Sequence, residues 1–284
     1  MDRLPPWLRQ SKRDVVKIHQ MKKRLRGRRL HTVCEEARCP NMAECFARPT
    51  ATFMILGNRC TRNCGFCNVE HGQPPAPDPQ EPQLVANAAK EMELTHVVLT
   101  SVTRDDLPLG GAEHFRACVT AIKTELPSAT VEVLTPDFRG SREALDLLVD
   151  APLDVFNHNV ETVPRLYPTA RAQADYRTSL DVLAYMAERM SLALIKSGLM
   201  LGLGEENEEI EAVLRDLYAA GVRAVTIGQY LRPRLSCLPV VRYIPPHEFE
   251  SWGTIAGKIG FANVASAPLV RSSYLADRMM RHDG

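Results

Sequence analysis

Three things are missing from this sequence: a long apolar run, a secretory signal and an excess of charge of either sign. No window reaches the roughly 18 uninterrupted apolar residues of a transmembrane helix, so we expect no membrane span. The N-terminus has no apolar core, which is not typical of a secretory signal, and we expect a cytoplasmic protein. The 35 basic and 34 acidic residues leave a net charge of +1, which argues against a protein that binds nucleic acid over its whole surface.

The charge is nevertheless unevenly distributed along the chain. Residues 1–30 hold eleven Lys or Arg against two Asp, a local charge of +9. Apart from Trp7, no aromatic residue alternates with these charges, so nucleic-acid binding is not indicated here either. Two interpretations stay open for this basic arm: a solvated tail, or a surface that attracts an acidic carrier protein.

Apolar runs alternate with amphipathic segments from about residue 52, and 45% of the residues are hydrophobic, enough for a substantial core. We expect strands at residues 52–56, 96–100, 130–134, 153–156, 192–201 and 224–227. We expect helices near residues 81–93, 112–124, 141–149, 173–189, 207–220 and 247–259. Such alternation predicts an α/β fold with right-handed crossovers and a parallel sheet. Six units are too few for a closed eight-stranded barrel and favour a partial (β/α)6 parallel barrel, with a doubly wound sheet as the alternative.

The strongest local signal is a cluster of three cysteines, Cys60, Cys64 and Cys67, directly after the first expected strand. Barrel enzymes place their chemistry in such loops, at the carboxyl ends of the strands. Three thiolates can bind three irons of a cubane cluster and leave the fourth iron open to a ligand. Structural zinc is the rival, but it needs four closed ligands, and His71 is the only further candidate nearby. The spacing therefore predicts an iron–sulfur site.

A second set of cysteines lies upstream, at Cys34, Cys39 and Cys45. Single cysteines are often buried in cores, but three within twelve mostly polar residues favour a metal site. A second cubane would need a fourth ligand from elsewhere in the chain or from the substrate. The remaining two cysteines, Cys118 and Cys237, are interpreted as thiols that bind no metal.

The three-cysteine loop resembles that of the radical S-adenosylmethionine enzymes, and the two cysteine sets together resemble the lipoyl synthase family. The upstream set distinguishes this pattern from biotin synthase. The resemblance covers roughly residues 30–277. Its matching segments are residues 32–45, 50–57, 100–106, 132–140, 155–161, 196–200, 226–230 and 271–274.

This resemblance implies a reaction, two cofactors and several partners. Adenosylmethionine is bound at the open iron of the Cys60, Cys64 and Cys67 cluster and cleaved to a 5′-deoxyadenosyl radical. Sulfur is then inserted at carbons 6 and 8 of an octanoyl group that is amide-linked to a carrier-protein lysine. The carrier would be a glycine-cleavage protein or a 2-oxoacid dehydrogenase subunit. A ferredoxin- or flavodoxin-type protein would donate electrons, and an iron–sulfur carrier would repair the cluster.

The resemblance also implies roles for the second cysteine set and for one serine. Cys34, Cys39 and Cys45 would hold a second [4Fe–4S] cluster, the sulfur donor, with Ser272 as its fourth ligand. An alkoxide is a harder ligand than a thiolate, so the iron that it binds is released from the cluster site more easily. Without the resemblance, Ser272 would be interpreted as a surface or capping serine. The implied segments are a basic arm (1–30), an auxiliary-cluster segment (31–50), the barrel (51–260) and a C-terminal extension (261–284).

Polar and glycine residues at the expected strand ends are candidates for binding adenosylmethionine. These candidates are Ser101, Asp106, Asn159, Glu161, Gly202 and Glu205. Helix capping and salt bridges at the rim explain the same residues equally well. His158, between two asparagines, is interpreted as a hydrogen-bonded structural residue because radical chemistry needs little acid–base help.

Some positions depart from the family pattern, and other functions stay open. The departures are Ser236-Cys237, Leu275, Asn58 and Pro49-Thr50, none of which removes a cluster ligand. A different two-cluster sulfurtransferase, such as a methylthiotransferase, would need an added RNA-binding domain for which no residues remain. A non-catalytic iron–sulfur carrier would need no adenosylmethionine pocket, and a zinc-stabilised module would contain no iron.

Overall fold

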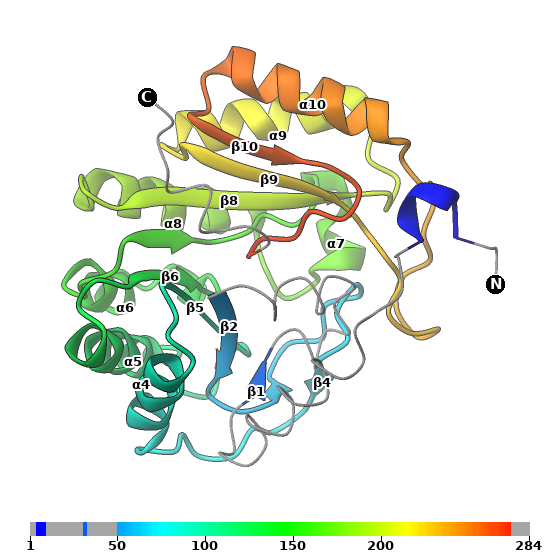
Figure 1. Cartoon of the computed structure of the whole chain (residues 1–284). Coiled ribbons are helices and arrows are strands. Elements are labelled where there is room, and N and C mark those ends of the chain that lie inside the picture. Colours follow the sequence, from blue (N-terminus) through cyan, green and yellow to red (C-terminus); the bar gives the residue numbers. More distant parts are fainter. Residues whose placement is uncertain (1–3, 10–30, 33–49, 274–284) are drawn as a thin grey trace.

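The computed structural model describes residues 4–9, 31–32 and 50–273, and its main feature is one curved sheet (Figure 1). The strand order is β1-β2-β5-β6-β7-β8-β9-β10. Within the described residues, β1 runs antiparallel to β2, and the other seven strands run parallel. The strands are β1 (His31–Thr32), β2 (Thr50–Ile55), β5 (His96–Ser101), β6 (Thr130–Leu134), β7 (Val155–Asn157), β8 (Leu194–Leu201), β9 (Ala224–Gln229) and β10 (Asn263–Ser266). A separate two-stranded sheet pairs β3 (Arg59–Cys60) with β4 (Glu70–His71).

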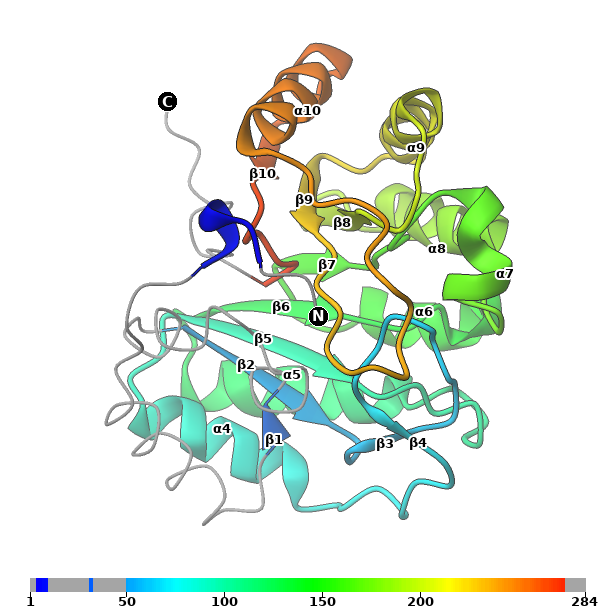
Figure 2. The same ribbon diagram turned by 90° about the vertical axis from the view of Figure 1, so that its right-hand side faces the viewer.

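Helices cover the outer face of the curved sheet, and each packs beside the next (Figures 1 and 2). The six long ones are α4 (Glu81–Glu91), α5 (Ala112–Glu125), α6 (Arg142–Val149), α8 (Tyr176–Arg189), α9 (Asn207–Ala219) and α10 (Pro246–Ile259). Shorter helical segments are η1 (Pro6–Leu8), η2 (Phe138–Gly140), η3 (Pro164–Leu166) and α7 (Tyr167–Ala170). No helix in the described ranges is long and apolar enough to cross a membrane.

The core lies between the sheet and this helical layer. Strands such as β2 and β5 are almost continuously buried, as expected for a parallel sheet covered by helices. Helix starts are set by local side chains. Ser141 Oγ accepts a hydrogen bond from Ala144 N at the start of α6, and Asp175 accepts one from Thr178 N at the start of α8. Each cap satisfies a backbone donor that the helix itself leaves free.

The α/β fold with a mostly parallel, open sheet confirms the fold class expected from the sequence. All six expected strands are present, and each is followed by a helix before the next strand of the sheet. Four further strands were not anticipated: β1 and β10 in this sheet, and β3 and β4 in the separate pair. The strand β10 extends the sheet beyond residue 260, into the segment that the sequence assigned to the C-terminal extension. Within the described strands, β1 and β10 form the two edges and do not pair with each other, so the barrel is not closed.

The inner face of the sheet carries charge as well as apolar groups. Glu132 lies between Val131 and Val133 in β6, and those two valines belong to the core, so its side chain points to the opposite face. Lys196 Nζ in β8 donates to both oxygens of Glu132, at 3.0 and 3.1 Å. Asn157 Nδ2 in β7 donates to the same carboxylate at 2.8 Å. Three neighbouring strands are therefore linked by a buried ion pair and an amide hydrogen bond to the same carboxylate.

Candidate active site

The three downstream cysteines lie in residues 58–69, a segment that follows β2 and includes the two-residue strand β3; we call it the cysteine loop. Cys60 Sγ accepts backbone hydrogen bonds from Arg62 N at 3.4 Å and Thr103 N at 3.3 Å. Cys67 Sγ accepts one from Val69 N at 3.5 Å. Backbone donors aimed at thiolates stabilise their negative charge, and hydrogen bonds to cluster sulfurs tune the potential of iron–sulfur centres.

Burial disfavours the thiolate form of two of these cysteines. It raises the pKa of Cys64 to about 11, although the nearby Arg171 guanidinium acts in the opposite direction. It raises the pKa of Cys67 to about 12. Both thiols are therefore protonated at neutral pH in the metal-free chain. Because metals bind thiolates, loading of this loop is expected to release protons.

The donor set fits a cubane cluster better than a single zinc ion. Among residues 4–9, 31–32 and 50–273, no three His, Cys, Asp or Glu side chains are placed to hold one metal ion together. A structural zinc site needs four ligands that converge on one point. Three cysteines that each bind a different iron of a cubane do not have to converge in this way.

Asn159, Glu161 and Ser272, expected on separate grounds, come together beyond the end of β7. Asn159 Nδ2 donates to Glu161 Oε1 at 3.2 Å, and Ser272 Oγ donates to Asn159 Oδ1 at 2.8 Å. The charge of Glu161 contributes to the raised pKa values of Cys64 and Cys67, which places this group near the cysteine loop. The C-terminal Arg271-Ser-Ser motif therefore lies beside two candidate adenosylmethionine ligands.

Glu161 has two features that are common at functional sites. It is a non-glycine residue with a positive φ of 68°, a backbone conformation that costs energy and persists only when its surroundings hold it. Burial raises the pKa of its carboxyl, and the guanidinium of Arg171 and the amide of Asn159 lower it. A half-buried carboxylate with few partners is suited to bind a ligand ammonium.

Ser101 and Asp106 have different surroundings at the end of β5. Ser101 Oγ is buried and has no hydrogen-bond partner among the described residues. Asp106 accepts two hydrogen bonds from Arg104, both at 2.9 Å, which hold the pKa of its carboxyl below the usual range. Asp106 therefore forms a salt bridge with Arg104 at the rim, the alternative that the sequence left open for it.

Gly202 and Glu205 form one turn after β8. Glu205 Oε2 accepts from Gly202 N at 2.8 Å and from Leu203 N at 3.0 Å, while its Oε1 accepts from the Thr162 hydroxyl at 3.0 Å. Gly202 has a φ of 114°, and an added Cβ would lie 2.3 Å from Gln229 Nε2. The carboxylate of Glu205 therefore shapes this turn through its own hydrogen bonds.

The other sequence candidates lie in three different situations. Cys34, Cys39, Cys45 and Leu275 lie outside the described residues. Cys118 lies in α5 and is buried in the hydrophobic core. Cys237 is buried against the cysteine loop, where its thiol donates to the Cys67 carbonyl at 3.3 Å. A pocket of about 610 Å³ opens beside that contact, and the residues lining it include Cys64, Gly65, Cys67, Ser236 and Cys237.

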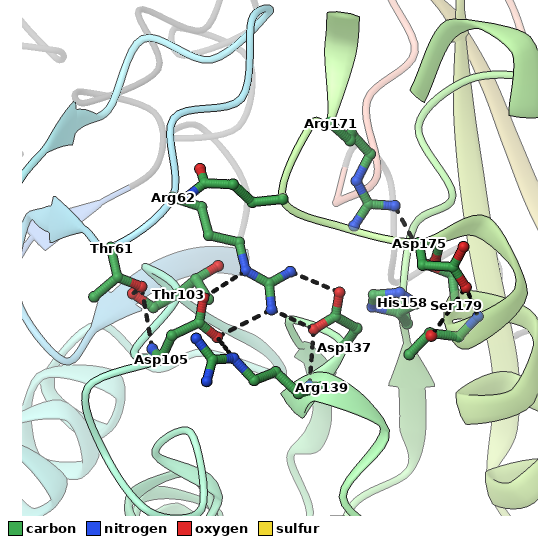
Figure 3. Close-up of polar contacts among 12 residues, drawn as sticks. Thr61, Arg62, Thr103, Asp105, Asp137, Arg139, His158, Arg171, Asp175 and Ser179 are labelled. Carbon is green, nitrogen blue, oxygen red and sulfur yellow. Dashed lines mark hydrogen bonds and ion pairs between the residues drawn. The ribbon is translucent and has the colours of Figure 1, made fainter. Parts of the chain in front are cut away.

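Two arginines near the site were missed by the sequence reasoning. Arg171 is buried, and its Nη1 donates to the carbonyls of Asn159 and Val160 and to the Tyr167 hydroxyl. Arg62, inside the cysteine loop, is 5% exposed and pairs with two aspartates (Figure 3). No sequence signal marks Arg171. Arg62 could have been noticed, because it is the one charged residue in the stretch from Cys60 to Cys67.

Comparison with known proteins identifies the family. A model of the radical SAM superfamily matches residues 54–217, and a model of the N-terminal domain of lipoyl synthase matches residues 1–39. Lipoyl synthase from Methylococcus capsulatus is 56% identical over 97% of this chain and 86% of its own length. The chain belongs to the lipoyl synthase family. Lipoyl synthases from Rubrobacter xylanophilus (54% identical) and Pseudoalteromonas translucida (52%) match 96% and 98% of the chain, and 85% and 87% of their own lengths.

Membership of the lipoyl synthase family makes this chain a radical SAM enzyme of lipoyl cofactor biosynthesis. Its cofactors include S-adenosylmethionine and a [4Fe–4S] cluster.

Solved structures support the fold independently of the sequence. SuiB from Streptococcus suis, bound to S-adenosylmethionine, superposes with a TM-score of 0.59 at 10% identity, covering 79% of this chain and 53% of that one. HydG, a maturase of the [FeFe]-hydrogenase, superposes with a TM-score of 0.58 at 14% identity, covering 91% of this chain and 57% of that one. At such low identity these matches show a shared fold alone.

Proposed function

We propose that this enzyme inserts sulfur at carbons 6 and 8 of an octanoyl group that is amide-linked to a lysine of a carrier protein. The observation that carries the proposal is the hydrogen bond from Ser272 to Asn159, which itself donates to Glu161 near the cysteine loop. It brings a hydroxyl from the C-terminal segment to the edge of the sheet where the cysteines and the candidate adenosylmethionine ligands lie. Radical formation and sulfur delivery can then take place beside the same bound substrate.

The cysteine loop would hold the first cluster. When bound, that cluster supplies the electron that cleaves adenosylmethionine to a radical able to take hydrogen from an unactivated carbon. Asn159 and Glu161 would bind the methionine ammonium, which would give the half-buried carboxylate a second cation beside Arg171. The unpartnered Ser101 hydroxyl would add a hydrogen bond. Gly202 and Glu205 would shape the turn against which the nucleoside lies, while Asp106 would keep the neighbouring rim in place through Arg104.

The segment 31–50 would hold the second [4Fe–4S] cluster through Cys34, Cys39 and Cys45, with Ser272 as the fourth ligand. In the metal-free chain the Ser272 hydroxyl donates to the Asn159 amide oxygen, a bond between neutral groups that an iron–alkoxide bond would replace. The substrate would be an octanoylated carrier, either a glycine-cleavage protein or a 2-oxoacid dehydrogenase subunit. A ferredoxin or flavodoxin would donate electrons, and an iron–sulfur carrier would restore the consumed cluster.

The test is an anaerobic turnover assay on protein reconstituted with iron and sulfide. Adenosylmethionine, a strong reductant and an octanoyl-lysine peptide are added, and the peptide and 5′-deoxyadenosine are followed by mass spectrometry. We expect a peptide that gains two sulfur atoms. Deoxyadenosine without sulfur on the peptide would point to a different acceptor. If the iron-loaded protein forms neither product, the catalytic proposal is contradicted.

Ser272→Ala tests the role of the serine, with Ser273→Ala as the matched neighbour. Loss of a cluster ligand is expected to leave adenosylmethionine cleavage in place and to abolish sulfur insertion, whereas Ser273→Ala should keep both. A wild-type yield of dithiol product from Ser272→Ala would rule out its role as a ligand.

A further inference from the structure

Arg62 is a buried arginine in the middle of the cysteine loop, between Cys60 and Cys64. Its guanidinium makes four hydrogen bonds to two carboxylates (Figure 3). Nε and Nη2 donate to Asp105 at 2.7 and 3.0 Å, and Nη1 and Nη2 donate to Asp137 at 2.6 and 2.7 Å. Both contacts are bidentate, the geometry in which the planar fork of arginine binds carboxylates most strongly.

The two carboxylates belong to different loops, each of which follows a strand of the sheet. Asp105 follows β5, and Asp137 follows β6. Asp137 is itself fixed, because its Oδ1 accepts a hydrogen bond from Arg139 N, and Arg139 Nε lies 3.2 Å from Asp105 Oδ1. Burial favours the neutral form of Asp137, but the hydrogen bonds from Arg62 outweigh it and hold the pKa at about 2. The two arginines and two aspartates form a charge-balanced network at the rim.

Backbone contacts fasten the same part of the loop to the end of β5. Thr61 N and Thr61 Oγ1 both donate to the Thr103 carbonyl, at 3.1 and 2.9 Å, and Asp105 N donates to Thr61 Oγ1 at 3.1 Å. Thr103 N in turn donates to Cys60 Sγ at 3.3 Å. Arg62 N donates to that same sulfur at 3.4 Å. The Arg62 side chain therefore holds the stretch of chain that connects two of the three cysteines.

We infer that Arg62 is a positioning residue that sets the placement of Cys60 and Cys64 for cluster binding through its paired contacts with Asp105 and Asp137. The inference rests on the proposed function, because it takes the cysteine loop as the place where the cluster binds. Lysine would keep the positive charge but cannot bridge two carboxylates with paired bonds. Arg59 lies in the same loop but is exposed, and within the described part of the chain its carboxylate contact is a 3.8 Å ion pair with Glu70. It serves as the matched control.

The experiment compares wild type, Arg62→Lys and Arg59→Lys after anaerobic reconstitution. Two quantities are measured: the rate at which a chelator removes iron, and the change that adenosylmethionine causes in the electron paramagnetic resonance signal of the reduced protein. Mutation of residues that hold metal ligands in place commonly lowers metal affinity by about 10- to 100-fold. We therefore expect Arg62→Lys to lose iron about tenfold faster than wild type and to respond more weakly to adenosylmethionine. Arg59→Lys should match wild type in both quantities.

The outcomes separate this inference from the proposed function. If Arg62→Lys holds iron and responds to adenosylmethionine as wild type does, the positioning role is wrong and the proposed function is untouched. If wild type itself shows no signal that responds to adenosylmethionine, the cluster assignment fails and the inference fails with it. If Arg62→Lys does not fold, Asp137→Asn is tested in its place. We expect this variant to lose iron faster than wild type as well, and wild-type iron retention and response would overturn the inference.

Discussion

At the scale of single residues, His158 shows how burial sets a protonation state. Its Nδ1 lies 2.9 Å from the Thr135 carbonyl, which only accepts, so Nδ1 carries the proton. Its Nε2 is buried and has no hydrogen-bond partner in the described part of the chain. Burial, together with the positive charge of Arg171, lowers the pKa of His158 to about 4. The imidazole is therefore neutral at pH 7, in agreement with its interpretation as a structural residue.

This lowered pKa predicts a pH dependence of stability. The unfolded chain takes up a proton on His158 near pH 6.5, and the folded chain does so only near pH 4, so the free energy of unfolding falls as the pH falls between these values. One group contributes up to about 1.4 kcal/mol per pH unit in this window. Urea unfolding at pH 7, 6 and 5 should show that His158→Asn loses this contribution. Identical slopes in the wild type and His158→Asn would contradict the assignment.

At the scale of elements, the turn after β8 depends on a residue without a side chain. At Gly202, an added Cβ would meet Gln229 Nε2 at 2.3 Å and the Arg242 carbonyl at 2.7 Å. Gln229 Nε2 donates to that same carbonyl and to the carbonyls of Leu201 and Tyr230. The turn is thus fixed by contacts that leave no room for a methyl group.

Gly202→Ala is therefore expected to lower the free energy of unfolding by about 2–3 kcal/mol, from backbone strain and the close contacts together. Gly257→Ala is the matched control in α10, because an added Cβ there meets nothing within 4 Å. That change should stabilise the protein by about 0.5–1 kcal/mol, since alanine is the better helix former. Thermal or urea unfolding would decide, and equal effects of the two changes would contradict the structural account.

At the scale of the whole molecule, the ion pair of Lys196 and Glu132 connects the middle of the sheet. Burial alone would raise the pKa of Glu132, but Lys196, His96 and Asn157 together hold it at about 2. The carboxylate therefore stays charged inside the protein and depends on its partner. A buried charge that loses its partner is strongly destabilising.

Lys196→Met is expected to lower the free energy of unfolding by about 3–5 kcal/mol because it leaves Glu132 charged and unpaired. The double change Lys196→Met with Glu132→Leu should recover most of this loss, because it removes the second charge as well. Lys90→Met, which breaks an exposed pair with Glu125, should have no measurable effect. Chemical unfolding of the four proteins measures all three effects. A double variant no more stable than Lys196→Met alone would show that the pair is not the cause.

The sequence by itself determined much of the fold, because parallel strands and their helices carry their own periodic patterns. The strand expected at residues 153–156 lies at Val155–Asn157, close to its predicted place. The strand β10 was missed because its four residues are only half-buried and include no apolar run. The cysteine loop could be predicted because its three cysteines lie within eight residues, so their spacing is a local property.

Only the tertiary structure decided how the rest of the site is assembled. Arg62 and Asp137 are 75 residues apart in the sequence, and Ser272 and Asn159 are 113 apart. Each pair meets because its members follow parallel strands of one sheet and so lie at the same carboxyl edge, although those strands are not adjacent. Strand order and register set those distances, and no local pattern of residues encodes them.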